Sequence, residues 1–236
     1  MYSARNNLII ALDTSDLNQA VNLAKKLKNE VYAVKLGLEF FTKNGAAGVK
    51  KIRSLGVEIF LDLKFHDIPN TVSKAVNEIV KLDINMLTIH SQGGYEMMKF
   101  AQDSAKKTAQ KNGYKLPIIL AVTILTSLDQ KIFKQINARQ KIADQVLTLA
   151  RIAKKANIPG IVCSPHEIAL VKENNLNLKI ITPGIRFSDS KSNDQKRIMT
   201  PKEALDLGAN YLVMGRPILE GGDIMSNIAK FNKEVS

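Results

Sequence analysis

The sequence predicts an α/β protein folded as a single (β/α)8 barrel, the TIM-barrel architecture, and three observations support this fold class. Short apolar segments typical of strands alternate with amphipathic segments typical of helices along the whole chain, which favours a parallel sheet. About eight such units fit into 236 residues, an ordinary length for this barrel. No Gly-x-Gly-x-x-Gly motif follows the first strand, which disfavours an open dinucleotide-binding sheet.

Each predicted strand is a short run rich in residues that favour β-structure. The predicted strands span residues 8–12, 31–36, 58–64, 86–90, 118–123, 160–163, 179–182 and 211–214. Helical spacing of apolar residues separates them, for example in residues 17–27, where the apolar residues are Leu17, Ala20, Val21, Ala24 and Leu27. Asp16 can cap this helix, because an aspartate side chain accepts hydrogen bonds from N–H groups of the first turn.

Two segments lack such a pattern. Residues 127–137 follow the fifth strand, and residues 187–196, which are polar and rich in small side chains, follow the seventh. The second segment is either a plain surface loop or a lid, and a lid is at least as consistent with its place on the catalytic face of a barrel. No linker or change of composition divides the chain, so we expect one domain over residues 1–236.

Composition restricts the compartment and the class of protein. No apolar run approaches the ~20 residues of a membrane span, and residues 1–7 are too few before the first strand for a signal peptide. Cys163 is the only cysteine and lies in an apolar run, so we expect a buried hydrophobe, not a nucleophile. A lone cysteine excludes an internal disulfide framework, and we expect a cytoplasmic protein.

The net charge of +12 raises the possibility of nucleic-acid binding, but the basic residues form no single stripe. They fall on separate amphipathic helices, for example at 25–28, 50–53 and 154–155. No aromatic residues interleave with them, and tryptophan is absent, so stacking platforms for bases are missing. We therefore expect no nucleic-acid partner, although a positive field favours encounter with an anionic metabolite.

Charged residues gather where the first three predicted strands end. Asp62 and Lys64 share one face of the third strand by alternation, and Asp67 follows in the next loop. Lys35 ends the second strand and points inward, and Asp13 ends the first. For one residue a structural ion pair is a fair alternative. Several charges together at the C-terminal end of a barrel favour an active site.

A phosphate site is predicted at the loops after strands seven and eight, the usual place in such barrels. Arg186 follows strand seven within Pro-Gly-Ile-Arg, and Gly215, Arg216 and Pro217 follow strand eight. Glycine lets backbone N–H groups approach, proline can start a helix whose N-terminus favours an anion, and arginine adds a two-pronged donor. Gly-Arg-Pro alone could be a turn, but this position favours phosphate.

Seven blocks of the sequence resemble, in order, the motifs of the orotidine 5′-phosphate decarboxylase family. The longest is DLKFHDIPNT at residues 62–71. The other blocks are Ala11-Leu12-Asp13, Val34-Lys35-Leu36-Gly37, Val122-Thr123-Ile124-Leu125-Thr126-Ser127, Thr182-Pro183-Gly184-Ile185-Arg186, Asp194-Gln195 and Gly215-Arg216-Pro217. The resemblance covers nearly the whole chain. It implies a cofactor-independent lyase that converts orotidine 5′-phosphate to uridine 5′-phosphate and carbon dioxide in pyrimidine (UMP) biosynthesis.

The resemblance also implies roles for the charged residues. Lys35, Asp62, Lys64 and Asp67 would form an alternating network beneath the substrate, with Asp67 supplied by the neighbouring subunit of a homodimer. Lys64 would stabilise charge at C6 and then donate a proton there, held by Lys35 and Asp67, while Asp62 lies near the leaving carboxylate. Asp13 would contact the ribose, although a strand-end carboxylate could also cap the next helix.

Further substrate-binding positions follow from the same resemblance. They are Leu63, Phe65, His66, Ile68, Pro69, Asn70, Thr71, Thr126, Arg186, Gln195, Gly215 and Arg216, with Ser127 as a neighbour of Thr126. Ile68 and Thr71 would reach across the dimer interface with Asp67, whereas Pro69 alone could merely open a helix. Thr126 would lie near the pyrimidine, and Gln195, on the lid, would close over the phosphate.

No metal site is predicted from the histidines. His66 lacks further ligands at metal-binding spacing. His90 ends strand four, where we expect a hydrogen bond in the barrel mouth, and His166 is expected on the surface at a helix start.

Two other functions compete with the decarboxylase. A keto-sugar-phosphate decarboxylase of the same superfamily shares Asp-x-Lys-x-x-Asp but uses magnesium; the continuation at 66–71 favours the nucleotide enzyme. A basic barrel that only binds nucleic acid would retain DNA in a salt-dependent way without turnover.

Overall fold

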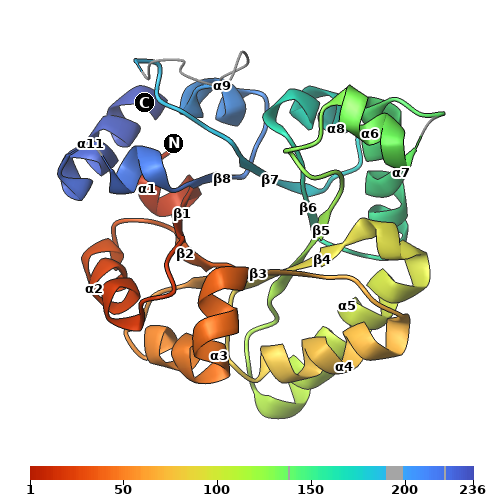
Figure 1. Ribbon diagram of the computed structural model, residues 1–236, viewed down its shortest axis with the longest axis horizontal. Coiled ribbons are helices and arrows are strands. Elements are labelled where there is room, and N and C mark those ends of the chain that lie inside the picture. Colours follow the sequence, from red (N-terminus) through yellow and green to blue (C-terminus); the bar gives the residue numbers. More distant parts are fainter. Residues whose placement is uncertain (138, 190–198, 221) are drawn as a thin grey trace.

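Eight parallel strands close into a barrel that is surrounded by helices in the computed structural model (Figure 1), which describes residues 1–137, 139–189, 199–220 and 222–236. Each strand pairs with the next, and β8 completes the ring by pairing with β1. The strands are β1 Leu8–Leu12, β2 Ala33–Leu36, β3 Ile59–Phe65, β4 Met86–His90, β5 Ile118–Val122, β6 Gly160–Val162, β7 Lys179–Pro183 and β8 Tyr211–Met214. The predicted fold class is therefore confirmed.

Helices follow the strands and form the outer layer (Figure 1). They are α1 Ala4–Asn7, α2 Leu17–Leu27, α3 Leu38–Arg53, α4 Pro69–Val80, α5 Gly94–Asn112, α6 Gln130–Ile136, α7 Ile142–Lys155, α8 Ile168–Glu173, α9 Pro201–Asp206, α10 Arg216–Leu219 and α11 Ile224–Val235, with 3-10 turns η1 Ser91–Gly93 and η2 Pro165–Glu167. Within the described residues, none of these helices has the length and apolar character needed to cross a membrane.

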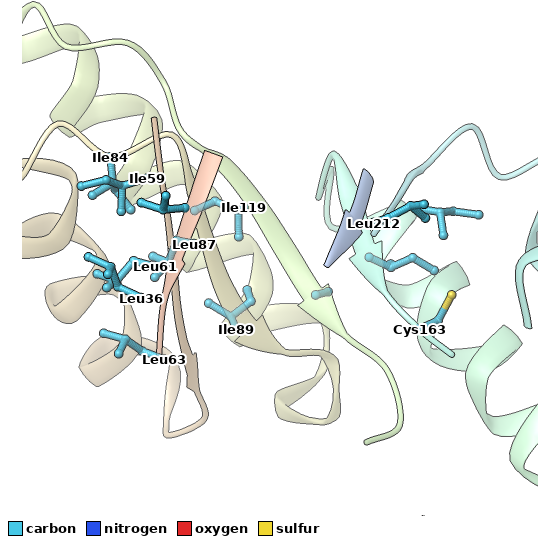
Figure 2. Packing of buried hydrophobic residues seen from close by; sticks show 14 of the residues in the cluster. Leu36, Ile59, Leu61, Leu63, Ile84, Leu87, Ile89, Ile119, Cys163 and Leu212 are labelled. Atoms are coloured by element: carbon cyan, nitrogen blue, oxygen red, sulfur yellow. The ribbon is translucent and has the colours of Figure 1, made fainter. Parts of the chain in front are cut away.

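Two apolar layers hold the barrel together. The interior is filled by side chains from seven strands, namely Ile9, Ala11, Ala33, Phe60, Met86, Leu120, Ile181 and Val213, so it is a packed core and not a pore. Outward-facing strand residues pack under the helices, and Leu36, Leu61 and Leu63 lie together in this layer (Figure 2). On β3, alternation therefore places odd-numbered residues outside and Phe60 and Asp62 inside.

The helix predicted at residues 17–27 is α2, with the same bounds. Its cap is also confirmed, because the Asp16 side chain accepts hydrogen bonds from the backbone N–H groups of Asn18 and Gln19. The segment 127–137, in which the sequence shows no strong pattern, is partly helical. It contains α6, capped by Asp129, and the helix buries only Phe133, so no apolar periodicity marks it in the sequence.

The start of β2 also differs from the prediction, because the strand was expected to begin at residue 31 and begins at Ala33. The chain bends at Val31 and Tyr32. The Tyr32 ring lies against that of Tyr211, with centroids 4.3 Å apart, at the N-terminal end of the barrel. Tyr32 therefore closes the N-terminal end of the barrel together with Tyr211, the first residue of β8, and does not extend β2.

Glu167 lies in η2, directly beyond β6 on the C-terminal side of the barrel. Its carboxylate accepts a hydrogen bond from the backbone N–H of Ser164 at 2.9 Å and forms a capping box. Burial raises the pKa of Glu167 to about 7, and the bond from Ser164 opposes this only in part. The folded protein therefore binds this proton more tightly than the unfolded chain does.

Replacing Glu167 by glutamine is expected to stabilise the protein at alkaline pH. Because the pKa of Glu167 is raised on folding, the wild type loses stability as the pH rises from about 4.5 to the folded value of about 7. Glu167→Gln cannot ionise, so its free energy of unfolding should exceed that of the wild type by about 2 kcal/mol at pH 8, and by much less at pH 5. Denaturant unfolding at both pH values measures this difference.

Glu203 provides the matched control, because it occupies the same position in the capping box of α9. Hydrogen bonds from the backbone and side chain of Thr200 lower the pKa of Glu203. Glu203→Gln should therefore change the pH dependence with the opposite sign, and destabilise the protein at neutral pH. Parallel pH profiles for the wild type and Glu167→Gln would contradict the assignment.

Candidate active site

The barrel mouth is organised by an irregularity in β3. The pairing register with β4 shifts between Leu61 and Phe65, and Lys64 has a positive φ of 51°, which a residue with a Cβ adopts at a cost of roughly 1–2 kcal/mol. As a result, the Lys64 Nζ atom lies 2.9 Å from both carboxylate oxygens of Asp62. The charged ends of Asp62 and Lys64, which are two residues apart in the sequence, are thereby in direct contact.

Lys35 and Asp13 extend this pair into a network of alternating charge. The Lys35 Nζ atom lies 3.7 Å from Asp62 and 3.4 Å from Asp13. The side chains of Lys35 and Asp62 are each only 13% exposed, whereas that of Asp13 is 70% exposed. Two ammonium groups and two carboxylates balance, which lowers the cost of placing them in a partly buried site.

Thr88 completes the network and is a site residue that was not predicted from the sequence. This fully buried residue lies on the inner face of β4, and its Oγ1 atom accepts a hydrogen bond from the backbone N–H of Lys64 at 2.9 Å. The same hydroxyl donates to Asp62 at 2.8 Å. Thr88 thus provides a hydrogen-bond acceptor for the Lys64 backbone N–H, which the irregular strand pairing leaves without a backbone partner. The same hydroxyl holds the Asp62 carboxylate in place. Strand alternation from Met86 could have indicated its inward side chain.

A small cavity lies beside this network. It has a volume of about 120 Å³ and is lined by Leu12, Asp13, Lys35, Gly37, Leu38, Glu39, Phe40, Asp62 and Lys64. Ligand pockets usually exceed ~300 Å³, so this cavity accommodates only part of a nucleotide, and the remainder would lie across the open mouth.

The segment after β3 is exposed to solvent. His66, Asp67, Ile68, Asn70 and Thr71 are all exposed, and Ile68 is 66% exposed despite its apolar side chain.

Asp67 and the neighbouring apolar residues differ in where their side chains point. Asp67 accepts a hydrogen bond from the backbone N–H of Ile68, and it forms no ion pair with any cation in the part of the chain that the structure describes. Leu63 and Phe65, by contrast, pack into the apolar layer under the helices, and Leu63 is only 6% exposed. The Leu63 side chain thus points away from the mouth, and Pro69 opens α4.

The predicted phosphate residues lie on the same end of the barrel. Gly215 and exposed Arg216 follow β8. A Cβ atom built on Gly215 would lie 3.6 Å from the Asp13 carboxylate, so the glycine lines the mouth. Arg216 and Pro217 open α10, which is only four residues long. Arg186 follows β7 and is half-buried.

Other predicted site residues are exposed or lie outside the residues that the structure describes. Thr126 and Ser127 form an exposed turn after β5. Gln195 and most of the segment 187–196 lie outside the described residues. At the start of this segment, Phe187 is buried, and the Nζ atom of Lys230 lies 4.5 Å from the centroid of its ring.

The structure also places the histidines and the cysteine. The Nδ1 atom of His90 is buried without a hydrogen-bond partner among the described residues, so the expected bond in the barrel mouth is not found for this atom. His166 is exposed and Cys163 is buried, as expected. Across the described ranges, no group of three or more His, Cys, Asp or Glu residues is arranged to hold a metal ion.

Known proteins are similar to this chain in both sequence and fold. A family model described as orotidine 5′-phosphate decarboxylase / HUMPS family matches residues 6–231. The chain belongs to this family. The orotidine 5′-phosphate decarboxylase of Ehrlichia chaffeensis is 48% identical over 225 residues, or 94% of each chain, and that of Pseudoalteromonas translucida is 42% identical over 235 residues, or 99% of each.

A solved structure supports the same conclusion. The orotidine 5′-phosphate decarboxylase of Lactobacillus acidophilus is 36% identical, with a TM-score of 0.85 over 98% of this chain and 99% of that one. The resemblance noted in the sequence motifs is thereby confirmed. The description of the orotidine 5′-phosphate decarboxylase / HUMPS family carries two names, so the individual relatives, and not the family alone, favour the nucleotide enzyme.

Proposed function

We propose that this protein is a lyase that removes the carboxylate from C6 of orotidine 5′-phosphate and releases uridine 5′-phosphate and carbon dioxide, a step in pyrimidine biosynthesis. The single observation that carries the proposal is the Lys64 ammonium group, held 2.9 Å from both oxygens of Asp62 at the barrel mouth. Relatives named orotidine 5′-phosphate decarboxylase at 42–48% identity support the choice of substrate.

The chemistry requires a fixed positive charge at one carbon atom. When the bond between C6 and the carboxylate breaks, its electron pair remains on C6 in the plane of the ring, without ordinary delocalisation. An ammonium group oriented beforehand stabilises this charge without reorganising in the transition state. Lys64 then gives a proton to C6, forms the new C–H bond and is reprotonated by solvent. Lys35 and Thr88 keep Asp62, and through it Lys64, in place.

The other site residues divide between the ends of the nucleotide. In this proposal Asp13 contacts the ribose, Thr126 lies near the pyrimidine, and Arg216 and Gly215 bind the phosphate together with Arg186. The exposed position of Arg216 beyond β8 supports the last assignment, since barrels commonly bind phosphate there. Gln195 stays a predicted phosphate contact outside the described residues.

We further propose a cytoplasmic homodimer in which Asp67 completes the neighbouring site. Asp67 is exposed and lacks a cation partner in the described part of its own chain, although the network it would join lies at the end of the same strand. Ile68 beside it exposes 66% of its surface, which suits burial against a second subunit. His66, Asn70 and Thr71 belong to the same exposed segment.

Turnover is expected to survive removal of metal ions, because lysine ammonium groups supply the positive charge. The test is the rate of orotidine 5′-phosphate consumption, followed by absorbance, before and after exhaustive chelation. The rates should agree within about twofold. Loss of activity that magnesium restores, or turnover of a keto-sugar phosphate in place of the nucleotide, would favour the keto-sugar-phosphate decarboxylase.

Arg216→Ala is expected to weaken binding of the nucleotide far more than binding of a nucleoside. A charge-assisted hydrogen bond to phosphate contributes about 1.5–3 kcal/mol, which corresponds to roughly 10- to 150-fold in affinity. Competition by uridine 5′-phosphate and by uridine measures the two effects. Arg151→Ala, on the outer face of α7, is the control and should change neither; an equal loss for both ligands with Arg216→Ala would indicate a structural arginine.

A further inference from the structure

His66 and His90 form a pair of rings beside the charge network, and the proposed reaction uses neither ring chemically. Their centroids are 5.3 Å apart and their planes are tilted by 37°. His90 ends β4 in the same inward row as Thr88, whereas His66 immediately precedes Asp67 in the exposed segment 66–71. The pair is therefore a side-chain contact between the barrel wall and the segment that carries Asp67.

The surroundings of His90 favour an uncharged ring. Burial lowers the pKa of His90, and the nearby His66 and Lys64 lower it further, against an opposing effect of Asp62. These three residues, on β3 and the loop beyond it, are the titratable groups that face His90 within the described residues. Its Nδ1 atom also has no hydrogen-bond partner there. A proton on His90 would thus face Lys64, and a proton on both rings would place two like charges in contact.

We propose that His90 is a positioning residue: its ring holds His66, and through it Asp67, in the geometry that the neighbouring site requires, and protonation of both rings separates them. The inference rests on the proposed function, because Asp67 matters only where it completes a second active site. It adds to that function a device that lowers activity at acid pH.

The contact can be tested without substrate by hydrogen exchange of the backbone amides of residues 66–71, each corrected for its intrinsic rate. In the wild type, protection should fall at least about fivefold between pH 8 and about pH 4.5, well below the ordinary pKa of histidine, because the pKa of His90 is lowered. His90→Phe keeps a ring that cannot take a proton and should show no such fall. His90→Ala should lose protection at both pH values, and His166→Ala, which changes the third, exposed histidine, should behave as the wild type.

Activity provides the second readout. The ratio of kcat/KM at pH 8 to that at about pH 4.5 should be about fivefold smaller in His90→Phe than in the wild type. Because the phosphate of the substrate itself titrates near pH 6, the comparison between variants is decisive, and not the wild-type profile. If His90→Phe does not fold, His66→Phe places the uncharged ring on the exposed side of the pair and must give the same two results.

The two proposals fail in different ways. A wild type without turnover whose exchange still follows the expected pattern would overturn the proposed function and support the contact. Normal turnover with the same pH ratio in the wild type and in the phenylalanine variants would overturn the positioning role of His90. Equal exchange protection at both pH values in the wild type would overturn it as well.

Discussion

Lys64→Ala is expected to lower kcat/KM for orotidine 5′-phosphate by about 10⁴-fold or more while the protein remains folded. Removing the ammonium group eliminates both electrostatic stabilisation and positioned proton transfer, each of which commonly contributes ~10²-fold or more. Alanine keeps the Cβ atom, so the backbone at Lys64, with its φ of 51°, is not relieved of strain. Steady-state kinetics on the purified variant measure the loss of kcat/KM. Its circular dichroism and thermal midpoint show whether the protein is still folded.

A control for Lys64→Ala is Lys50→Ala, which removes an exposed lysine of α3 and should leave turnover unchanged. Near-normal turnover in folded Lys64→Ala would remove Lys64 from the proton-donating role. Asp62 would then have lost its closest cation, since Lys35 remains 3.7 Å away, and another donor would have to be sought around the mouth.

Asp67→Asn is expected to be nearly inactive alone and to regain activity when it is mixed with Lys64→Ala. In a mixed dimer, one site takes Lys64 from the first chain and Asp67 from the second and is intact, while the other site carries both defects. Each mixed dimer should therefore reach roughly half of the wild-type activity, and an equimolar mixture with random exchange about a quarter. Turnover after subunit exchange measures this recovery, and mass spectrometry of differently tagged chains measures the fraction of mixed dimers.

The complementation experiment has an internal control, because mixing two preparations of Lys64→Ala carrying different tags should restore nothing. If tagged heterodimers of Lys64→Ala and Asp67→Asn form without any recovery, Asp67 serves the site of its own chain. A monomer at the assay concentration that is nevertheless active would contradict the shared site altogether.

Much of the fold could be predicted because local patterns and tertiary demands agree. The bounds of β1, β4 and β8 match the predicted ranges, since each strand is an apolar run with polar residues or turns at its ends. The inward direction of Lys35 follows from alternation alone, and its ion pairs with Asp13 and Asp62 confirm it. Charged residues at the ends of parallel strands meet because a closed barrel brings those ends together.

What could not be predicted depends on contacts between segments distant in sequence. The positive φ of Lys64 follows from a register shift that only the pairing of β3 with β4 defines. Thr88 gains its role from that shift, because it replaces the missing backbone partner. The contact of His66 with His90 joins two elements whose relative position is set by the same pairing. α6 buries one large side chain and therefore leaves no periodic signal.

The most direct test of the central claim is a mass balance with orotidine 5′-phosphate labelled in its carboxylate group. We expect the wild-type protein, without added metal, to release labelled carbon dioxide and uridine 5′-phosphate in equal amounts, and we expect Lys64→Ala to release neither above background. A folded wild-type protein that binds the nucleotide yet releases no labelled carbon dioxide would contradict it.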